Sequence, residues 1–398
     1  MKKKILFYTS GVGLGGVERI ILEVLKGMDK NKFDIKLALQ YENENLFENE
    51  ISKEVNYKYM LPQKIIDKSL YFRERKKNIF YKILYSFMLN YEKYIIKKNY
   101  LEFSKDREIV IDFKSGDFFK LINLKNGVEK KRICWLHGEI TKLNKYEKRK
   151  KFLRENLNKC DKVVCICEDM KNGVIKEIPE LEEKLEIIYN PFDIEKIKIK
   201  SSDYSEIKKE EKKLLEDNYI IMVSRLDNVQ KDFDTIINAF KIVNQKRKDI
   251  KLYLLGDGPD KEKIENMIRN KNLQEYIKLL GAKKNPYPWI KNSKLLVHSS
   301  RYEGFGLVLV EALILDKVVI STNCKVGPRE ILDNGKYGSL VEVGNYNVMA
   351  QEILELLQEN SIKKERYLSN IDKSVERFDK RNIIKQIERV LEGMLNDK

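Results

Sequence analysis

Histidine and cysteine are scarce in this chain of 398 residues, which holds two histidines and five cysteines. The histidines, His137 and His298, have no cysteine partners at the spacing of zinc ligands, so no zinc site is expected. The cysteine count is odd and no Cys-x-x-Cys pair occurs. This pattern favours free thiols in a reducing cytoplasm over a disulfide framework.

Long apolar runs are also missing. No stretch of about 18 apolar residues occurs, so the sequence predicts no membrane-spanning helix. Lysines open the chain, but the apolar residues behind them end at Tyr8, which is too few for the core of a signal peptide. We therefore expect any contact with a membrane to be peripheral.

The charge balance is strongly basic, with a formal net charge of +16. Such a surplus attracts nucleic acid, an anionic membrane or a phosphorylated substrate, and it equally fits a charge that only keeps the protein in solution. No recognised nucleic-acid-binding module occurs, so no nucleic-acid partner is expected.

Strands and helices alternate in both halves of the chain, which predicts an α/β protein with parallel sheets. The length exceeds what one core supports, so two domains are expected. A strand is predicted to end at Asn190-Pro191, and the stretch that follows it to about Asp217 is predicted to be charged and irregular. We expect Rossmann-like domains at 1–193 and 194–375, and a closing helix within 376–398 that packs back toward the first domain.

Residues 64–100 are basic and aromatic, with ten Lys/Arg, three Asp/Glu and nine Tyr/Phe. The spacing predicts a helix with an apolar face opposite the basic Lys82, Lys93 and Lys97. Such a helix is typical of a peripheral contact with an anionic membrane, and the alternative is a core helix with a solvated basic face. The predicted apolar face consists of Phe80, Leu84, Phe87, Met88, Tyr91 and Ile95.

A glycine-rich loop at 11–16 follows the first strand and precedes a helix. It matches Gly-x-Gly-x-x-Gly, in which glycines let the backbone approach a phosphate at a helix N-terminus. An NAD-dependent oxidoreductase is one interpretation, although Glu42 and Glu44 come late for its ribose-binding acid. A tight turn without a ligand is another.

Two cations, Arg225 and Lys231, follow the strand at 219–224. At the carboxyl end of a strand they face the edge where open α/β sheets bind ligands, and together they would neutralise a diphosphate. The following Asp232-Phe-Asp234 is either a metal-binding pair or, more simply, a helix cap.

A second glycine-flanked loop, 303–306, enters an apolar helix, with Glu303 before the helix and Glu311 about one turn into it. Two carboxylates beside a diphosphate repel it unless they bind hydroxyl groups such as those of a ribose and a sugar. Alternatively, Glu303 caps the turn and Glu311 is a surface residue.

The spacing of Glu303 and Glu311 resembles the Glu-x7-Glu motif of the group 1 glycosyltransferases, a retaining family with the GT-B fold. Ser224 and Asp232 depart from the glycines usual in that family. The resemblance implies two Rossmann-like domains with a cleft between them. Further matching elements are Gly15-Gly-Val-Glu-Arg19, Trp135-Leu-His137-Gly138, Asn190-Pro-Phe-Asp193, Gly256-Asp-Gly-Pro259 and Gly327-Pro-Arg-Glu330.

The resemblance also implies roles for particular residues. Glu303 would contact the donor sugar near the reacting carbon, with His137 beside the sugar, whereas His298 is interpreted as structural. Glu311 would bind the ribose. The donor diphosphate would be held by Arg225, Lys231 and the backbone amides of Phe305, Gly306 and Leu307, with Gly15 and Gly16 lining the cleft.

The function that this implies is retaining transfer of a hexose or N-acetylhexosamine from a nucleotide diphosphate sugar, with a UDP-sugar favoured. The acceptor would be a saccharide or lipid-linked saccharide in the synthesis of cell-surface polysaccharide, lipopolysaccharide or glycan. We expect no metal and no cofactor, and a cytoplasmic location at the inner face of the membrane. The alternative is the NAD-dependent oxidoreductase.

Overall fold

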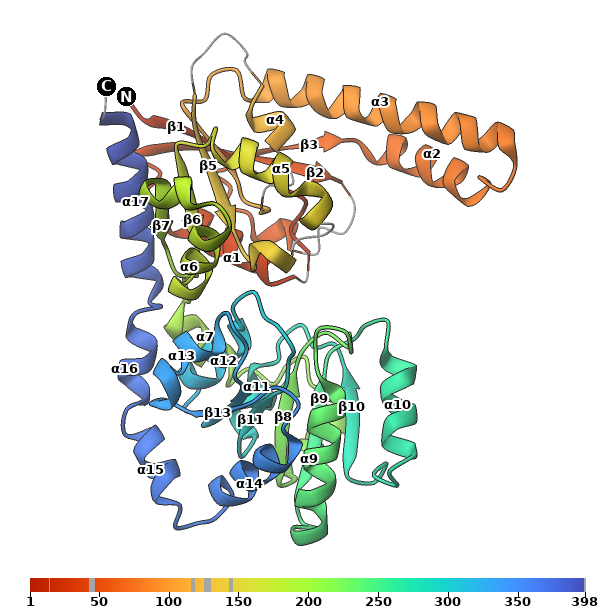
Figure 1. The fold of residues 1–398 in the computed structure, drawn as a ribbon, viewed down its shortest axis with the longest axis vertical. Helices are drawn as coiled ribbons and strands as arrows, with labels where there is room; N and C mark the ends of the chain where they lie inside the picture. The colour runs from red at the N-terminus through yellow and green to blue at the C-terminus, as the bar shows by residue number, and fades with distance from the viewer. Residues whose placement is uncertain (14, 43–46, 116–118, 125–129, 143–145, 397–398) are drawn as a thin grey trace. The chain divides into compact units, whose positions relative to one another are not determined.

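The computed structural model describes residues 1–13, 15–42, 47–115, 119–124, 130–142 and 146–396. The chain divides into two compact units. The N-terminal unit combines Met1–Phe192 with Lys380–Lys398, and the C-terminal unit is Asp193–Asp379. Each unit has its own sheet (Figure 1).

The N-terminal unit is built on a seven-stranded sheet in the order β3-β2-β1-β4-β5-β6-β7, and every neighbouring pair is parallel. The central strands are fully buried because helices cover both faces, so they read as continuous apolar runs. The strands are β1 Lys3–Thr9, β2 Phe33–Tyr41, β3 Asn56–Leu61, β4 Ile109–Asp112, β5 Lys131–Leu136, β6 Lys162–Cys165 and β7 Leu185–Ile187.

Helix α17, the last of the chain, packs on α1 in the N-terminal unit. A Cβ at Gly27 would lie 2.6 Å from the Ile384 side chain, so the helices meet where α1 has no side chain. Lys380 and Glu23 form an ion pair of 2.7 Å across the same contact. The helices of this unit are α1 Gly16–Gly27, α2 Gln63–Glu74, α3 Ile79–Phe103, α4 Phe119–Ile122, α5 Tyr146–Leu157, α6 Glu168–Glu177 and α17 Lys380–Asn396, with 3-10 turns η1 Glu48–Glu50, η2 Ile140–Lys142 and η3 Pro179–Lys184.

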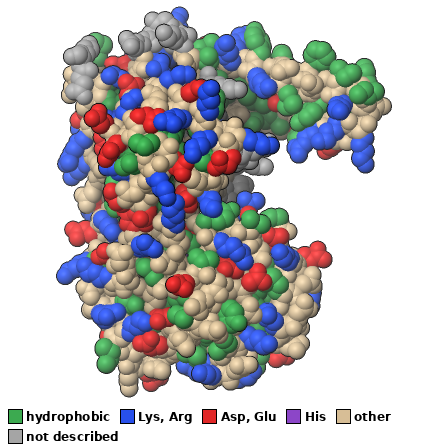
Figure 2. Space-filling model, in the orientation of Figure 1, with side chains coloured by type: hydrophobic (Ala, Val, Ile, Leu, Met, Phe, Trp, Pro, Cys, Tyr) green, Lys and Arg blue, Asp and Glu red, His purple; other side chains and the backbone are tan. Residues whose placement is uncertain are grey.

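Helices α2 and α3 form an arm that extends past the β3 edge of this sheet, and hydrophobic and basic side chains cover it (Figures 1 and 2). The six residues of the apolar face predicted for this segment all lie on α3, but they differ in burial. Phe80, Phe87 and Tyr91 are exposed, whereas Met88 is buried. Since α3 contacts both α2 and β3, part of the predicted face is turned inward. No helix among the described residues is long and apolar enough to cross a membrane.

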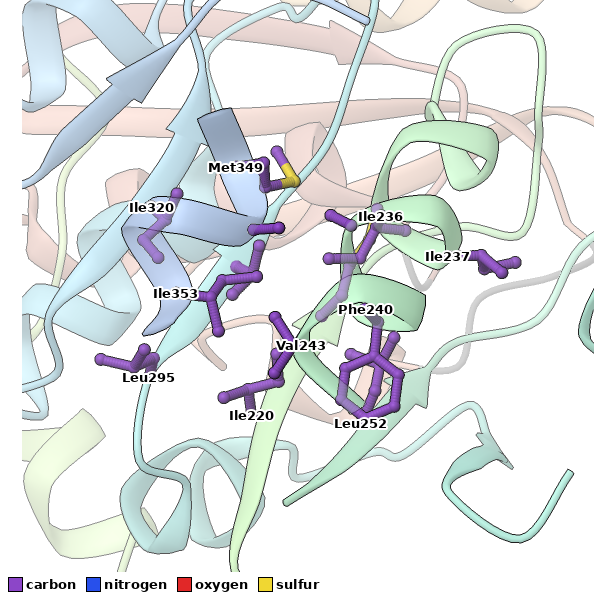
Figure 3. Packing of buried hydrophobic residues seen from close by; sticks show 14 of the residues in the cluster. Ile220, Ile236, Ile237, Phe240, Val243, Leu252, Leu295, Ile320, Met349 and Ile353 are labelled. Carbon is purple, nitrogen blue, oxygen red and sulfur yellow. The ribbon is translucent and has the colours of Figure 1, made fainter. Parts of the chain in front are cut away.

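The C-terminal unit contains a six-stranded parallel sheet in the order β10-β9-β8-β11-β12-β13. Its core lies between this sheet and helices α9 and α14, where Ile236, Phe240 and Ile353 pack over Ile220 and Ile320 (Figure 3). The strands are β8 Tyr219–Val223, β9 Lys251–Leu255, β10 Ile277–Gly281, β11 Leu296–His298, β12 Val319–Thr322 and β13 Ser339–Val341.

The stretch before β8, predicted to be irregular, is partly helical, so that prediction is wrong. Asp193 caps α7 by accepting a hydrogen bond of 3.0 Å from the Lys196 amide, and Ile197 is buried. The helices of the C-terminal unit are α7 Ile194–Lys200, α8 Lys209–Lys212, α9 Phe233–Lys246, α10 Lys261–Arg269, α11 Tyr287–Asn292, α12 Leu307–Ile314, α13 Pro328–Ile331, α14 Tyr346–Leu356, α15 Ile362–Leu368 and α16 Ile371–Glu376, with 3-10 turns η4 Lys213–Glu216 and η5 Asp333–Gly335.

Candidate functional site

The segments that follow β8 and β11 carry the predicted site residues of the C-terminal unit. These strands are neighbours in a parallel sheet, so their carboxyl ends open at the same edge. Backbone pairing then joins the two segments. Lys231 and Ser300 form an antiparallel bridge, and the Arg301 amide donates to the Gln230 carbonyl at 2.8 Å. This pairing brings Lys231 next to the segment that contains Glu303.

Glu303 lies at the centre of a buried polar cluster. Its Oε1 accepts hydrogen bonds from the Lys231 ammonium and from Ser300 Oγ, the latter at 2.5 Å. The same oxygen lies 2.7 Å from Nε2 of His298. Glu303 is 6% exposed and His298 is 1% exposed. The structure therefore brings together two of the predicted site residues, Glu303 and Lys231, with a histidine that was not predicted to join them.

The protonation states of this cluster follow from its charges. Burial alone would raise the pKa of Glu303, but the neighbouring Lys231 and His298 outweigh it and hold that pKa well below its usual range. Burial lowers the pKa of His298 despite the nearby carboxylate. Because an ionised carboxylate can only accept, a neutral His298 must donate through Nε2. Glu303 is therefore an anion with one oxygen fully engaged.

Arg225 does not join this cluster. Its side chain is exposed and forms no ion pair in the part of the chain that the structure describes. The loop that carries it packs against the turn after β9. Gly256 has φ +143°, and a Cβ there would lie 1.8 Å from the Ser224 carbonyl oxygen. Only glycine fits this approach, so the Gly-Asp-Gly-Pro element supports the loop of Arg225.

Helix α12 begins at the same edge of the sheet. Gly306 precedes it in the left-handed region with φ +99°, and Phe305 is buried behind it. Gly327, at φ +93°, packs so closely that a Cβ would lie 1.9 Å from the Phe305 carbonyl oxygen. The glycines therefore fix the loop that leads into α12 at Leu307. The N-terminus of α12 is a place for an anion, because its first amides have no carbonyl partner within the helix.

Glu311 is buried inside α12, so the alternative that it is a surface residue is wrong. Tyr287 donates a hydrogen bond of 3.2 Å to its Oε1. Asp232 is the N-cap residue of α9 and accepts hydrogen bonds from the Thr235 amide at 3.3 Å and from Arg301 at 2.8 Å. The capping interpretation of Asp232 is thereby confirmed.

The predicted residues of the N-terminal unit, Gly15, Gly16 and His137, follow β1 and β5, the two strands on either side of β4 in its sheet. Gly15 and Gly16 are exposed at the start of α1. Lys114, after β4, pairs with Glu18 of α1 at 2.8 Å. The His137 amide, after β5, donates to Ser115 Oγ at 3.0 Å. The three loops thus form one connected edge.

His137 lies in an aromatic environment, with its ring centroid 4.6 Å from that of Phe113 and stacked on Trp135 at 6.3 Å. Burial, together with the nearby charge of Lys114, lowers the pKa of His137 to about 3. His137 is therefore neutral near pH 7. Its Nε2 is buried and has no hydrogen-bond partner among the described residues.

Comparison with known proteins identifies the C-terminal unit. Residues 203–374 match the family model of the glycosyl transferases group 1. The matched part of the chain, within the C-terminal unit, is that of a group 1 glycosyltransferase. Glu303, Lys231, His298 and Glu311 all lie within the matched residues of this family.

Individual relatives agree with this assignment. The chain is 30% identical over 265 residues to an uncharacterized glycosyltransferase of Methanocaldococcus jannaschii, covering 59% of this chain and 64% of the relative. It is 32% identical over 210 residues to the N-acetylgalactosamine-N,N'-diacetylbacillosaminyl-diphospho-undecaprenol 4-alpha-N-acetylgalactosaminyltransferase of Campylobacter jejuni, covering 53% of this chain and 54% of the relative. The chain thus spans less than two thirds of the length of either relative.

The crystal structure of HepE from Anabaena in complex with UDP and glucose superposes with a TM-score of 0.76 and 19% identity, covering 98% of this chain and all of that one. This similarity confirms the predicted GT-B fold.

The oxidoreductase interpretation finds no support in the structure or the comparisons. Glu42 accepts a hydrogen bond of 2.6 Å from the Gln63 amide at the start of α2, so its carboxylate is already engaged. Glu44 lies outside the described residues. The two relatives named above are both named as glycosyltransferases.

His298 and Ser300 are the site residues that sequence reasoning missed. His298 ends β11, and Ser300 lies two residues later, on the way to Glu303. Their position at this edge of the sheet was the available signal. It was overlooked because a histidine closing an apolar strand is usually a satisfied core residue.

Proposed function

We propose that this chain is a retaining glycosyltransferase that moves a hexose or N-acetylhexosamine from a nucleotide diphosphate sugar, with a UDP-sugar favoured, to a saccharide or lipid-linked saccharide. The observation that carries this proposal is the buried Lys231–Glu303–His298 cluster at the edge where α12 begins. The structural neighbour HepE binds UDP and glucose. The Campylobacter relative is named for a diphospho-undecaprenol-linked acceptor. The reaction would serve the synthesis of cell-surface polysaccharide, lipopolysaccharide or glycan.

The leaving diphosphate would be stabilised by Lys231, Arg225 and the amides that open α12. Bond cleavage leaves negative charge on the diphosphate, and fixed donors that face the developing charge lower the barrier. Lys231 can bind phosphate while keeping its contact with Glu303, because an ammonium group has three donors. Arg225, which is exposed and without an ion pair among the described residues, remains available for the same anion. These groups would do this without a metal ion.

Glu303 would act on the sugar. Its Oε1 is held by Lys231, Ser300 and His298, while Oε2 has no hydrogen bond in the described part of the chain. The free oxygen of an ionised carboxylate can accept a sugar hydroxyl and stabilise positive charge at the anomeric carbon. In this proposal Glu311 binds the ribose.

Retention of configuration would follow from attack by the acceptor on the face that the diphosphate leaves. A double displacement needs a carboxylate nucleophile at the anomeric carbon, and we assign none. The neutral His137 would offer its open Nε2 to the sugar as a hydrogen-bond donor. The acceptor would be bound by the N-terminal unit, where the loops of Gly15, Gly16 and His137 meet. The cytoplasmic location expected from the free cysteines stays a prediction.

A panel of nucleotide sugars tests this proposal directly. Thermal shift with UDP-, GDP- and ADP-sugars, with NAD as the comparison ligand, should give stabilisation by a nucleotide sugar and none by NAD. Product analysis with the best donor should then show a new glycosidic bond of retained configuration. Stabilisation by NAD alone, or hydrolysis with inversion, would overturn the proposal.

A further inference from the structure

Helix α3 carries an exposed stripe of apolar side chains. Phe80, Ile83, Phe87, Tyr91 and Tyr94 are separated by three or four residues, so they lie on one face of the helix. Phe80 is 61% exposed and Phe87 is 69% exposed. A contiguous apolar patch of this kind on a protein surface marks an interaction site. We call these five residues the α3 stripe.

The α3 stripe is not needed to hold the helix in place. A different face of α3 packs inward, where Met88 and Tyr100 are buried. The Asn99 side chain donates a hydrogen bond of 2.9 Å to the Met60 carbonyl of β3. The core-helix alternative therefore accounts for the inward face and leaves the exposure of the stripe unexplained.

The segment that carries the α3 stripe is strongly basic. Residues 64–100 contain ten Lys/Arg and three Asp/Glu, and all ten cations are exposed. Within the described chain, only Arg75 among them contacts an acidic side chain, that of Glu74 at 3.9 Å. The remaining cations are free to bind anions. Basic and hydrophobic side chains are seen together along this arm (Figure 2).

Apolar and basic side chains together favour an anionic lipid surface over a second copy of the chain as the partner of this arm. A second copy of the chain would place two strongly basic arms against each other, and the unpaired like charges would repel. An anionic lipid surface offers the opposite charge to the lysines and an apolar layer to the phenylalanines. Tyr91 and Tyr94, at the C-terminal end of the stripe, suit the level of the headgroups.

We propose that the α3 stripe and the cations of 64–100 dock the protein on an anionic lipid bilayer, with α3 lying in the plane of the surface. This docking would bring the enzyme to a lipid-linked acceptor, and to that extent it rests on the proposed function. Binding to lipid is nevertheless measurable without any transfer reaction.

Flotation of the full chain with vesicles tests the proposal. Vesicles of phosphatidylcholine with phosphatidylglycerol should carry the protein to the top of a gradient, and vesicles of phosphatidylcholine alone should not. Phe80→Ser/Phe87→Ser should weaken binding at least about tenfold, since it removes the most exposed apolar contacts. Lys76→Glu/Lys77→Glu should weaken binding more than about 25-fold, because each positive charge lost near the surface weakens binding about fivefold.

Two matched variants control for general effects. Ile199→Ser/Ile362→Ser removes apolar residues from the C-terminal unit that are even more exposed than Phe80 and Phe87, and Lys241→Glu/Lys246→Glu makes the same charge change on α9. Both should float like the unmodified protein. Unchanged flotation of the stripe variant, or no flotation of the unmodified chain, would overturn the proposal. A dimer seen in sedimentation of the unmodified chain and absent in Phe80→Ser/Phe87→Ser would also overturn it.

Donor binding separates this inference from the proposed function. Thermal shift by UDP-sugar should be the same for the unmodified chain and for Phe80→Ser/Phe87→Ser, because no stripe residue belongs to the donor site. If the unmodified protein binds the donor but does not float with the vesicles, the docking proposal alone is refuted. Flotation without donor binding would refute the glycosyltransferase proposal alone.

Discussion

Oε1 of Glu303 lies 2.7 Å from Nε2 of His298, in the buried interior of the C-terminal unit. The two residues come from one segment, because β11 ends at His298 and the chain turns back before α12. The contact fixes which carboxylate oxygen of Glu303 is engaged and which is left for a ligand. His298 is therefore a positioning residue for the proposed reaction.

Replacing His298 tests that role. His298→Ala should lower kcat about tenfold to 100-fold with little change in KM for the donor, because it removes one hydrogen bond to a charged group. His298→Gln should recover part of the loss, since its amide can donate to Glu303. Steady-state kinetics with a UDP-sugar would measure both. An unchanged kcat in His298→Ala would show that the contact is only structural.

Lys231 and Arg225 should differ when each is replaced by alanine. Lys231→Ala should weaken UDP binding and also lower the free energy of unfolding by about 3 kcal/mol, because it leaves the buried Glu303 without its cation. Arg225→Ala should weaken UDP binding with little effect on stability, since its side chain is exposed. Calorimetric titration and urea unfolding give the two quantities. UDP binding unchanged in both variants would mean that the donor binds elsewhere.

The two histidines should make stability depend on pH. Burial lowers the pKa of His137 to about 3, so the folded chain leaves it neutral while the unfolded chain protonates it. The free energy of unfolding should fall as the pH drops below about 6.5, by up to about 1.4 kcal/mol per pH unit for each such histidine. Urea unfolding across this range measures the slope, and His137→Gln should reduce it. A histidine NMR signal that titrates near its ordinary pKa would contradict the assignment.

Chelation tests the expectation that no metal is required. Transfer activity should be unchanged after treatment with EDTA. In this proposal Lys231, Arg225 and the α12 amides stabilise the negative charge of the leaving diphosphate. Activity that is lost with EDTA and restored by Mg²⁺ or Mn²⁺ would assign that role to a metal instead.

Much of the fold was predictable because buried parallel strands are continuous apolar runs. Ile5, Ile221 and Leu254 lie in strands that the pattern predicted. β3 was missed because it is an edge strand that contains Asn56 and Lys58 and has exposed positions. α7 was missed because it is short and charged and depends on the cap at Asp193.

The candidate site was predictable where residue type and strand end coincide, as for Lys231 and Glu303. The role of His298 was not predictable, because sequence spacing does not say which way a chain turns after a strand. The exposed face of α3 also required the structure. Helical spacing gives the faces of a helix, and only packing against α2 and β3 decides which face turns outward.

Glu303→Gln offers the most direct test of the proposed donor site. It keeps the size of the side chain and removes its charge, so UDP should still bind with an affinity close to that of the unmodified protein. Transfer from the UDP-sugar should fall by at least about 100-fold, since an anion beside the reacting carbon is lost. Retained binding with lost transfer is the predicted result. Normal turnover in Glu303→Gln would contradict the central role of this carboxylate.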